Sequence, residues 1–139
     1  IAVLGLAADA RREGRTLGDL LAEFDETFGV FASDQVSVRT DDVAAVGEMM
    51  SALRKQHPHT VGDVPIEQVD DLLEGVDGLP PGDVLRLWLD DGSRVIVRPS
   101  GTEPKLKVYL DVRAESSGDA QSRLRALADG ARALLDSLA

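Results

Sequence analysis

The sequence of 139 residues contains no cysteine. This absence excludes a disulfide-stapled scaffold, a zinc–thiolate site and a thiol nucleophile. It also fits a cytoplasmic protein, which is the location we expect. A chain of this length buries roughly two thirds of its unfolded surface, so its core needs no covalent staple.

Basic residues are scarce as well. The 15 Lys and Arg residues are outnumbered by 25 Asp and Glu residues, giving a net charge of -10. Nucleic acids and anionic membranes both favour basic partners, so we expect neither as a partner. No apolar run approaches the ~20 residues that span a bilayer. The apolar residues 1 to 8 lack the basic leading region and the initiator Met of a signal peptide. We expect instead that this sequence is a segment of a longer protein.

The first 29 residues predict two helices. Residues 1 to 13 are rich in Ala and Leu, and Gly14 ends this first segment. Thr16 is a suitable N-cap for a second helix over about residues 17 to 27. Apolar side chains recur along it at helical spacing, namely Leu17, Leu20, Leu21, Phe24 and Phe28. We expect a domain boundary near residues 29 to 33, which gives a helical part at 1–29 and a second part at 30–139.

The second part begins with a strand at residues 35 to 39 and a helix from about residue 43 to 56, capped by Asp41 or Asp42. The predicted apolar stripe of this helix comprises Val43, Val46, Met50 and Leu53. His57 and His59 flank Pro58, which ends the helix. Two histidines without a carboxylate cluster do not make a zinc site. Residues 64 to 73 fit either a strand or a short helical turn.

Alternating apolar residues predict three antiparallel strands at 84–89, 94–98 and 106–113, the first two joined by an Asp90-Asp91-Gly92 hairpin. A last helix opens at Gly118 or Asp119, and Gly130 inside it costs roughly 1 kcal/mol relative to Ala. The predicted fold is α+β, with an antiparallel sheet of four or more strands and two helices on one face. Trp88, Ile96 and Tyr109 share a sheet face, which we expect to pack against a helix or another domain.

Positive charge gathers in one stretch of this acidic chain. Residues 94 to 113 carry five basic and two acidic side chains, a net charge of +3 against -13 for the remainder. Within it lies the loop Arg98-Pro99-Ser100-Gly101-Thr102-Glu103-Pro104-Lys105. Arg98 offers a planar, bidentate donor, Ser100 and Thr102 offer hydroxyls, and Gly101 permits close approach and positive φ. Successive N–H groups in such a turn bind anions, although an ordinary strand–turn–strand would use the same residue types.

These eight consecutive residues resemble the phosphate-binding signature of the α-D-phosphohexomutases, the phosphoglucomutase and phosphomannomutase superfamily. The resemblance implies that residues 30–139 are the fourth, TBP-like domain and residues 1–29 the end of the third domain and the linker. It implies an isomerase, an intramolecular phosphotransferase of carbohydrate metabolism, that interconverts hexose 1- and 6-phosphates through a phosphoserine and a bisphosphate intermediate. The phosphosugar and the preceding domains of the same enzyme are the implied partners.

By the same resemblance, Arg98, Ser100, Gly101, Thr102 and Lys105 hold the phosphate that is not transferred, and Glu103 orders the turn or pairs with a base. The family's phosphoserine loop, Asp-Gly-Asp-type Mg²⁺ loop and sugar-recognising loop do not occur in this sequence. We therefore expect no catalytic or metal-binding residue here, Mg²⁺ bound outside this chain, and no turnover by the chain alone. The alternatives are a non-enzymatic phosphometabolite-binding module, a domain of a phosphopentomutase or phosphoglucosamine mutase, and an interaction domain without a ligand.

Overall fold

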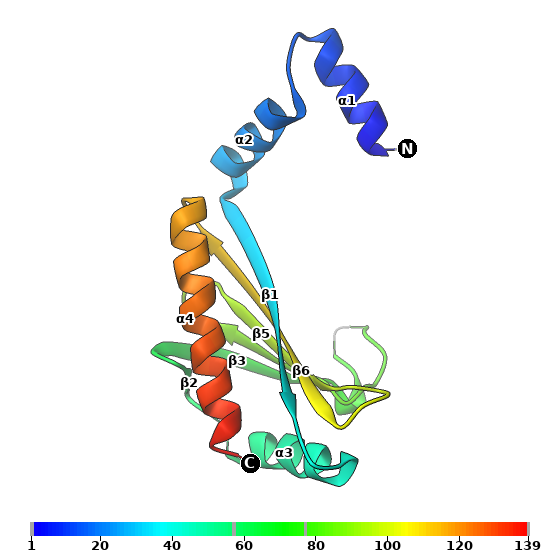
Figure 1. Cartoon of the computed structure of the whole chain (residues 1–139), viewed down its shortest axis with the longest axis vertical. Helices are drawn as coiled ribbons and strands as arrows, with labels where there is room; N and C mark the ends of the chain where they lie inside the picture. Colours follow the sequence, from blue (N-terminus) through cyan, green and yellow to red (C-terminus); the bar gives the residue numbers. More distant parts are fainter. Residues whose placement is uncertain (1, 57, 77, 139) are drawn as a thin grey trace.

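The computed structural model describes residues 2–56, 58–76 and 78–138. Its helices and strands follow one another along the chain as shown in Figure 1. They are α1 (Ala2–Arg12), α2 (Leu17–Phe28), β1 (Val30–Arg39), α3 (Val43–Gln56), β2 (Thr60–Val61), β3 (Val64–Asp71), a 3₁₀ turn η1 (Leu72–Glu74), β4 (Leu85–Leu89), β5 (Arg94–Pro99), β6 (Lys105–Ala114) and α4 (Ser117–Asp136).

The strands form one antiparallel sheet in the order β1-β6-β5-β4-β3-β2. This arrangement confirms the predicted α+β class and the three adjacent strands β4, β5 and β6. The sheet is larger than its predicted minimum of four strands because β2 and β3 add to it. β1 pairs with β6 over its whole length, from Val30 opposite Ala114 to Arg39 opposite Lys105. The first strand therefore begins at Val30, five residues earlier than predicted.

The sequence predicts either a strand or a short helical turn at residues 64 to 73, and the structure contains both. A turn at Gly62 joins β2 to β3, and η1 follows β3 directly. Gly62 has a φ of 60°, a left-handed conformation that glycine adopts without strain. The last helix begins slightly earlier than predicted, because the Ser116 hydroxyl accepts a hydrogen bond from the Asp119 N–H and caps it.

One face of the sheet carries the hydrophobic core and both long helices. The alternating residues Leu85, Leu87 and Leu89 of β4 point into it, as the period of two predicts. The buried residues of α3 and α4 belong to the same apolar cluster, which confirms that these helices share a face. Within α3, Met49 is buried whereas Val43 is 72% exposed, so the predicted place of Val43 in the stripe is wrong. Val43 is the first residue of the helix and lies beyond the edge of the contact.

The opposite face of the sheet, called the open face below, carries mostly polar and charged residues. Trp88 lies here between Arg86 and Arg94, whose guanidinium carbons are 5.1 and 5.4 Å from the ring centroid. Asp70 accepts hydrogen bonds from Arg86 and from the Trp88 indole N–H, both at 2.8 Å. The prediction that Trp88 packs against a helix is therefore wrong, since α3 and α4 cover the opposite face of the sheet. The alternative, a contact with another domain, stays a prediction.

The helices α1 and α2 extend away from the sheet at the end where β1 starts (Figure 1). Among the described residues, no helix is both long and apolar enough to cross a membrane.

Candidate phosphate-binding site

The loop between β5 and β6 is closed and anchored by backbone hydrogen bonds. The Ser100 N–H donates to the Lys105 carbonyl at 2.9 Å, and the Lys105 N–H donates to the Glu103 carbonyl at 2.8 Å. Thr40, in the connection from β1 to α3, donates its N–H to the Pro104 carbonyl at 3.0 Å, and its hydroxyl lies within hydrogen-bond distance of the carbonyls of Asp42, at 2.8 Å, and Pro104, at 3.1 Å. The loop is therefore held at both ends while its tip remains exposed.

The tip of the loop presents hydrogen-bond donors without acceptors. The N–H groups of Gly101, Thr102 and Glu103 donate to no atom of the described residues, and neither do the hydroxyls of Ser100 and Thr102. Three consecutive free N–H groups beside two hydroxyls form a concentration of positive dipoles that suits an oxyanion.

Two basic side chains lie beside the loop on the open face of the sheet. Arg98 of β5 is directly opposite Lys107 of β6 in the strand register. Neither forms an ion pair with a described residue, in contrast to Arg86 and Arg94 on the same face. Like charges directly opposite each other destabilise a sheet, so a bound anion would relieve their repulsion. Sequence reasoning missed Lys107, although the alternation of β6 placed it on the polar face.

The other two charges of the loop neutralise each other. Lys105 and Glu103 form an ion pair at 2.5 Å, and Arg39 lies 3.8 Å from Glu103. The hydrogen bond from Lys105, its charge and the charges of Arg39 and Lys107 lower the pKa of Glu103. This pair agrees with the expected structural role of Glu103. It also means that Lys105 reaches an anion only by sharing its ammonium group with that carboxylate.

The structure places Ser100, Gly101 and Thr102 on the short connection between β5 and β6, and Arg98 in β5 just before it. One expectation about the loop is wrong, because Gly101 does not have a positive φ. No atom lies within 4 Å of the position a Cβ would take at Gly101, so a ligand can approach this backbone freely. Its missing side chain thus leaves space rather than permitting an unusual conformation.

The sequence contains three pairs of adjacent aspartates, and in the structure their members serve as caps, turn residues and ion-pair partners: Asp41-Asp42, Asp70-Asp71 and Asp90-Asp91. Asp42 caps α3 through the Ala45 N–H at 2.8 Å, Asp71 caps η1, and Asp91 accepts from the Ser93 N–H in the hairpin. His57 lies outside the described residues. No three His, Asp or Glu side chains converge on a metal-sized site within residues 2–56, 58–76 and 78–138.

Comparisons with known proteins identify the family of the chain and agree with its fold. Residues 18–129 match the family model of the phosphoglucomutase/phosphomannomutase C-terminal domain. A probable phosphomannomutase of Haemophilus influenzae is 36% identical over 135 residues, which cover 97% of this chain and 27% of that protein. A phosphoglucomutase of Staphylococcus haemolyticus is 28% identical over 120 residues, covering 76% of this chain and 22% of that protein.

A solved structure supports the fold independently. The open form of pp63/parafusin from Paramecium, an exocytosis-sensitive phosphoprotein and phosphoglucomutase, superposes with a TM-score of 0.63 at 19% identity. The superposition covers 87% of this chain and 23% of that one. The chain belongs to the phosphoglucomutase/phosphomannomutase family and contains its C-terminal domain. It spans about a quarter of the length of the relatives it matches.

Proposed function

We propose that this chain is the substrate-phosphate-binding part of a phosphomutase that interconverts hexose 1-phosphate and hexose 6-phosphate. The β5–β6 loop holds the phosphate that stays on the sugar, while a phosphoserine outside this chain exchanges phosphate with the opposite hydroxyl. Residues 30–139 form the binding domain, and residues 1–29 connect it to the preceding domain. Mg²⁺, when bound elsewhere in the enzyme, would neutralise charge at the transferred phosphate.

The donors at the tip of the loop carry this proposal. A phosphate monoester presents oxygens in several directions, and the N–H groups of Gly101, Thr102 and Glu103 can each donate to one of them. Arg98 adds a fork of two parallel N–H groups that matches two oxygens of the same phosphate. Lys107 adds a point charge from the neighbouring strand. None of these groups forms a hydrogen bond or an ion pair with another described residue through the donors named here.

The loop N–H groups, Arg98 and Lys107 can bind and orient a phosphosugar. The ion pair with Lys105 lowers the pKa of Glu103 and so makes this carboxylate a weaker base. A fixed phosphate at one end of the sugar positions the hydroxyl at the other end, and such positioning converts binding energy into rate. The residues of this chain therefore contribute through orientation, and bond making falls to the rest of the enzyme.

Steady-state kinetics of the intact mutase with Arg98→Ala test the proposal. Losing one charge-assisted hydrogen bond costs about 1.5–3 kcal/mol, which lowers kcat/KM by roughly 10- to 150-fold. Arg113→Ala is the matched control, because it removes the same charge from the open face near the other end of β6. If kcat and KM of the Arg98 variant both equal those of the control, the loop does not hold substrate phosphate.

A further inference from the structure

The β5–β6 loop carries a carboxylate of its own beside the free donors. The Glu103 carboxylate lies 2.5 Å from the Lys105 ammonium and 3.8 Å from the guanidinium of Arg39, which is opposite Lys105 in the strand register. The charge of Lys107, two residues further along β6, also acts on this carboxylate. We call Arg39, Lys105 and Lys107 the loop cations. A negative charge is therefore built into the site that is proposed to bind an anion.

Backbone hydrogen bonds close this loop without the side chain of Glu103. The Ser100 N–H joins the two ends through the Lys105 carbonyl, and the Thr40 N–H holds the Pro104 carbonyl. The Lys105 N–H contacts the backbone carbonyl of Glu103, which any residue would supply. The side chain of Glu103 is 45% exposed, and ion pairs in contact with solvent add little to stability. The carboxylate is therefore not the main support of the turn.

A bound phosphate and the Glu103 carboxylate would interact with the same cations. The pKa of Glu103 is lowered, first by the hydrogen bond from Lys105 and then by the positive charges of the three loop cations. Coupling between two binding or charge sites is reciprocal. The carboxylate therefore stabilises the loop cations in the free protein, and it repels a second anion that approaches them. Any anion that binds at the loop must compete with this built-in one.

The repulsion from Glu103 grows with the charge that a ligand brings to the loop, because the Coulomb energy is proportional to the product of the two charges. A sugar monophosphate has one phosphoryl group at the end that the loop would hold, and the rest of the sugar is neutral. Pyrophosphate has a second phosphoryl group joined directly to the first. A carboxylate beside the loop therefore disfavours pyrophosphates more strongly than sugar monophosphates.

We propose that Glu103 is a specificity-determining residue, whose carboxylate competes with the ligand for the loop cations and makes the loop favour sugar monophosphates over pyrophosphates. The inference rests on the proposed binding of phosphate by the β5–β6 loop. It goes further because it assigns the ligand charge that the loop accepts. A residue that only orders the turn has the opposite effect when it is removed, because a less ordered loop binds every anion more weakly.

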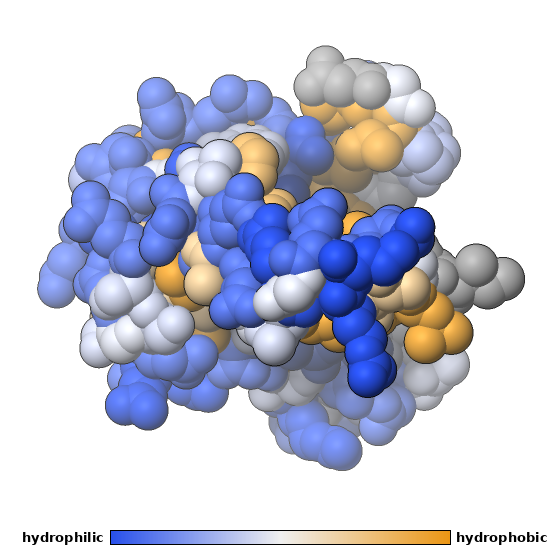
Figure 2. Space-filling model, turned by 90° about the horizontal axis from the view of Figure 1, so that it is seen from above, coloured by the Kyte–Doolittle hydropathy of each residue, from blue (hydrophilic) through white to orange (hydrophobic). Residues whose placement is uncertain are grey.

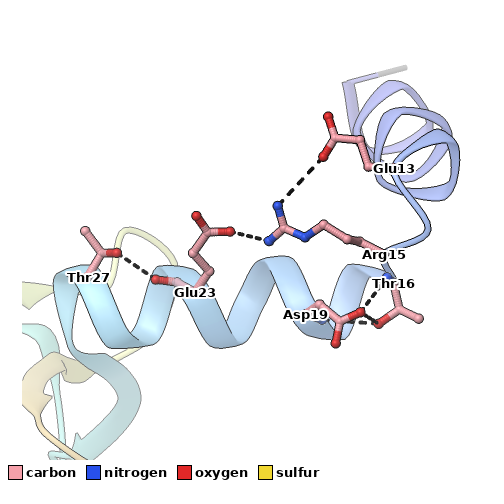
Figure 3. Close-up of polar contacts among 6 residues, drawn as sticks. All are labelled: Glu13, Arg15, Thr16, Asp19, Glu23 and Thr27. Carbon is pink, nitrogen blue, oxygen red and sulfur yellow. Dashed lines mark hydrogen bonds and ion pairs between the residues drawn. The ribbon is translucent and has the colours of Figure 1, made fainter.

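An ion pair on α2 supplies the matched control. Glu23 pairs with Arg15, which also lies 3.8 Å from Glu13 (Figure 3). This pair is at the start of β1, whereas the loop is at the end of β1 (Figure 1). Figure 2 looks onto the α1 end of the molecule and shows strongly hydrophilic residues open to solvent there. Glu23→Gln thus removes one carboxylate and one ion pair, as Glu103→Gln does, but away from the loop.

Amide chemical shifts of the isotope-labelled chain, titrated separately with glucose 6-phosphate and with inorganic pyrophosphate, give the two affinities. Glu103→Gln should tighten binding by about threefold for glucose 6-phosphate and by about 10-fold for pyrophosphate, because the lost charge acts on every charge of the ligand. Glu23→Gln should leave both affinities nearly unchanged. The gains should shrink as sodium chloride is added, since salt screens exposed charges. Glu103→Ala repeats the test if Glu103→Gln loses helical circular dichroism.

Weaker or unchanged binding of both ligands by the Glu103 variant would overturn the inference and leave Glu103 with a structural role alone. An equal gain for the two ligands, the same gain in Glu23→Gln, or a gain that persists at high salt would also overturn it. In these cases the parent still binds, so the proposed function stands. Loop amides that stay unshifted in parent and variant alike would instead overturn phosphate binding itself, and this inference with it.

Discussion

Gly130 is the point where α4 contacts the turn between β2 and β3, and its replacement by alanine should destabilise the protein. A Cβ at residue 130 would lie 2.5 Å from the Gly62 nitrogen, 2.7 Å from the Gly62 Cα and 3.1 Å from the Val61 carbonyl carbon. All three atoms are backbone, so no side chain can turn aside to make room. Gly130 and Gly62 thus allow the backbone of α4 to pack directly against the backbone of the β2–β3 turn at the edge of the sheet.

The expected magnitude is a difference between two opposing effects. Alanine favours a helix interior over glycine by about 0.8–1.0 kcal/mol. Overpacking costs typically about 1–3 kcal/mol, and a clash with rigid backbone belongs near the upper end of that range. Gly130→Ala should therefore lower the free energy of unfolding by about 2 kcal/mol. Helix propensity alone predicts the opposite sign.

Gly47 in α3 supplies the control. It is also within a helix, yet no atom lies within 4 Å of its hypothetical Cβ and its φ is not positive. Gly47→Ala should therefore raise stability by up to about 1 kcal/mol. Urea unfolding followed by circular dichroism, with the slope m unchanged, measures both variants. A Gly130→Ala protein as stable as the parent would refute the proposed packing of α4 on Gly62.

Three further predictions concern charge and activity. Lys107→Met should weaken the binding of glucose 6-phosphate to the chain by about 10-fold, since it removes one charge-assisted contact. Isothermal titration calorimetry of the parent, Lys107→Met and the control variant Arg113→Met measures this loss. Hydrogen bonds from Gln68, Trp88 and Arg86 lower the pKa of Asp70 below its ordinary value of 3.8. Its contribution to stability is therefore present above pH 3.8 and is lost as the pH falls through the lowered pKa. Chemical denaturation should accordingly show Asp70→Asn less stable than the parent at neutral pH, with the gap closing in acid, whereas a gap constant with pH would contradict this role. The purified 139-residue chain should show no mutase turnover in a coupled assay, and any turnover above a blank would overturn the assignment of bond making to other parts of the enzyme.

Local patterns predicted most of the fold. Alternation identified β4, β5 and β6 and their buried faces because a half-buried strand has a period of two regardless of its neighbours. Caps identified the start of α2 because Thr16 and Asp19 act within four residues of each other. The β2–β3 hairpin was missed because β2 has only two residues, too few to show any period.

The site could be predicted only in part, for a similar reason. The residues of the β5–β6 loop are contiguous, so the sequence alone brings Arg98 and Thr102 together. Lys107 reaches Arg98 through the register of two strands, and Thr40 reaches Pro104 across 64 residues. Such contacts depend on the tertiary fold. The ion pair between Lys105 and Glu103 likewise depends on how the loop closes, which residue types do not specify.

Phosphate binding by the β5–β6 loop is tested most directly by amide chemical shifts of the isotope-labelled chain titrated with glucose 6-phosphate. The free N–H groups of Gly101, Thr102 and Glu103 should shift together and saturably. Arg98→Met should weaken the apparent affinity by about 10-fold or more while Arg113→Met leaves it nearly unchanged. Amides of this loop that stay unshifted at millimolar ligand, or that shift alike in the Arg98 variant and the parent, would contradict the account.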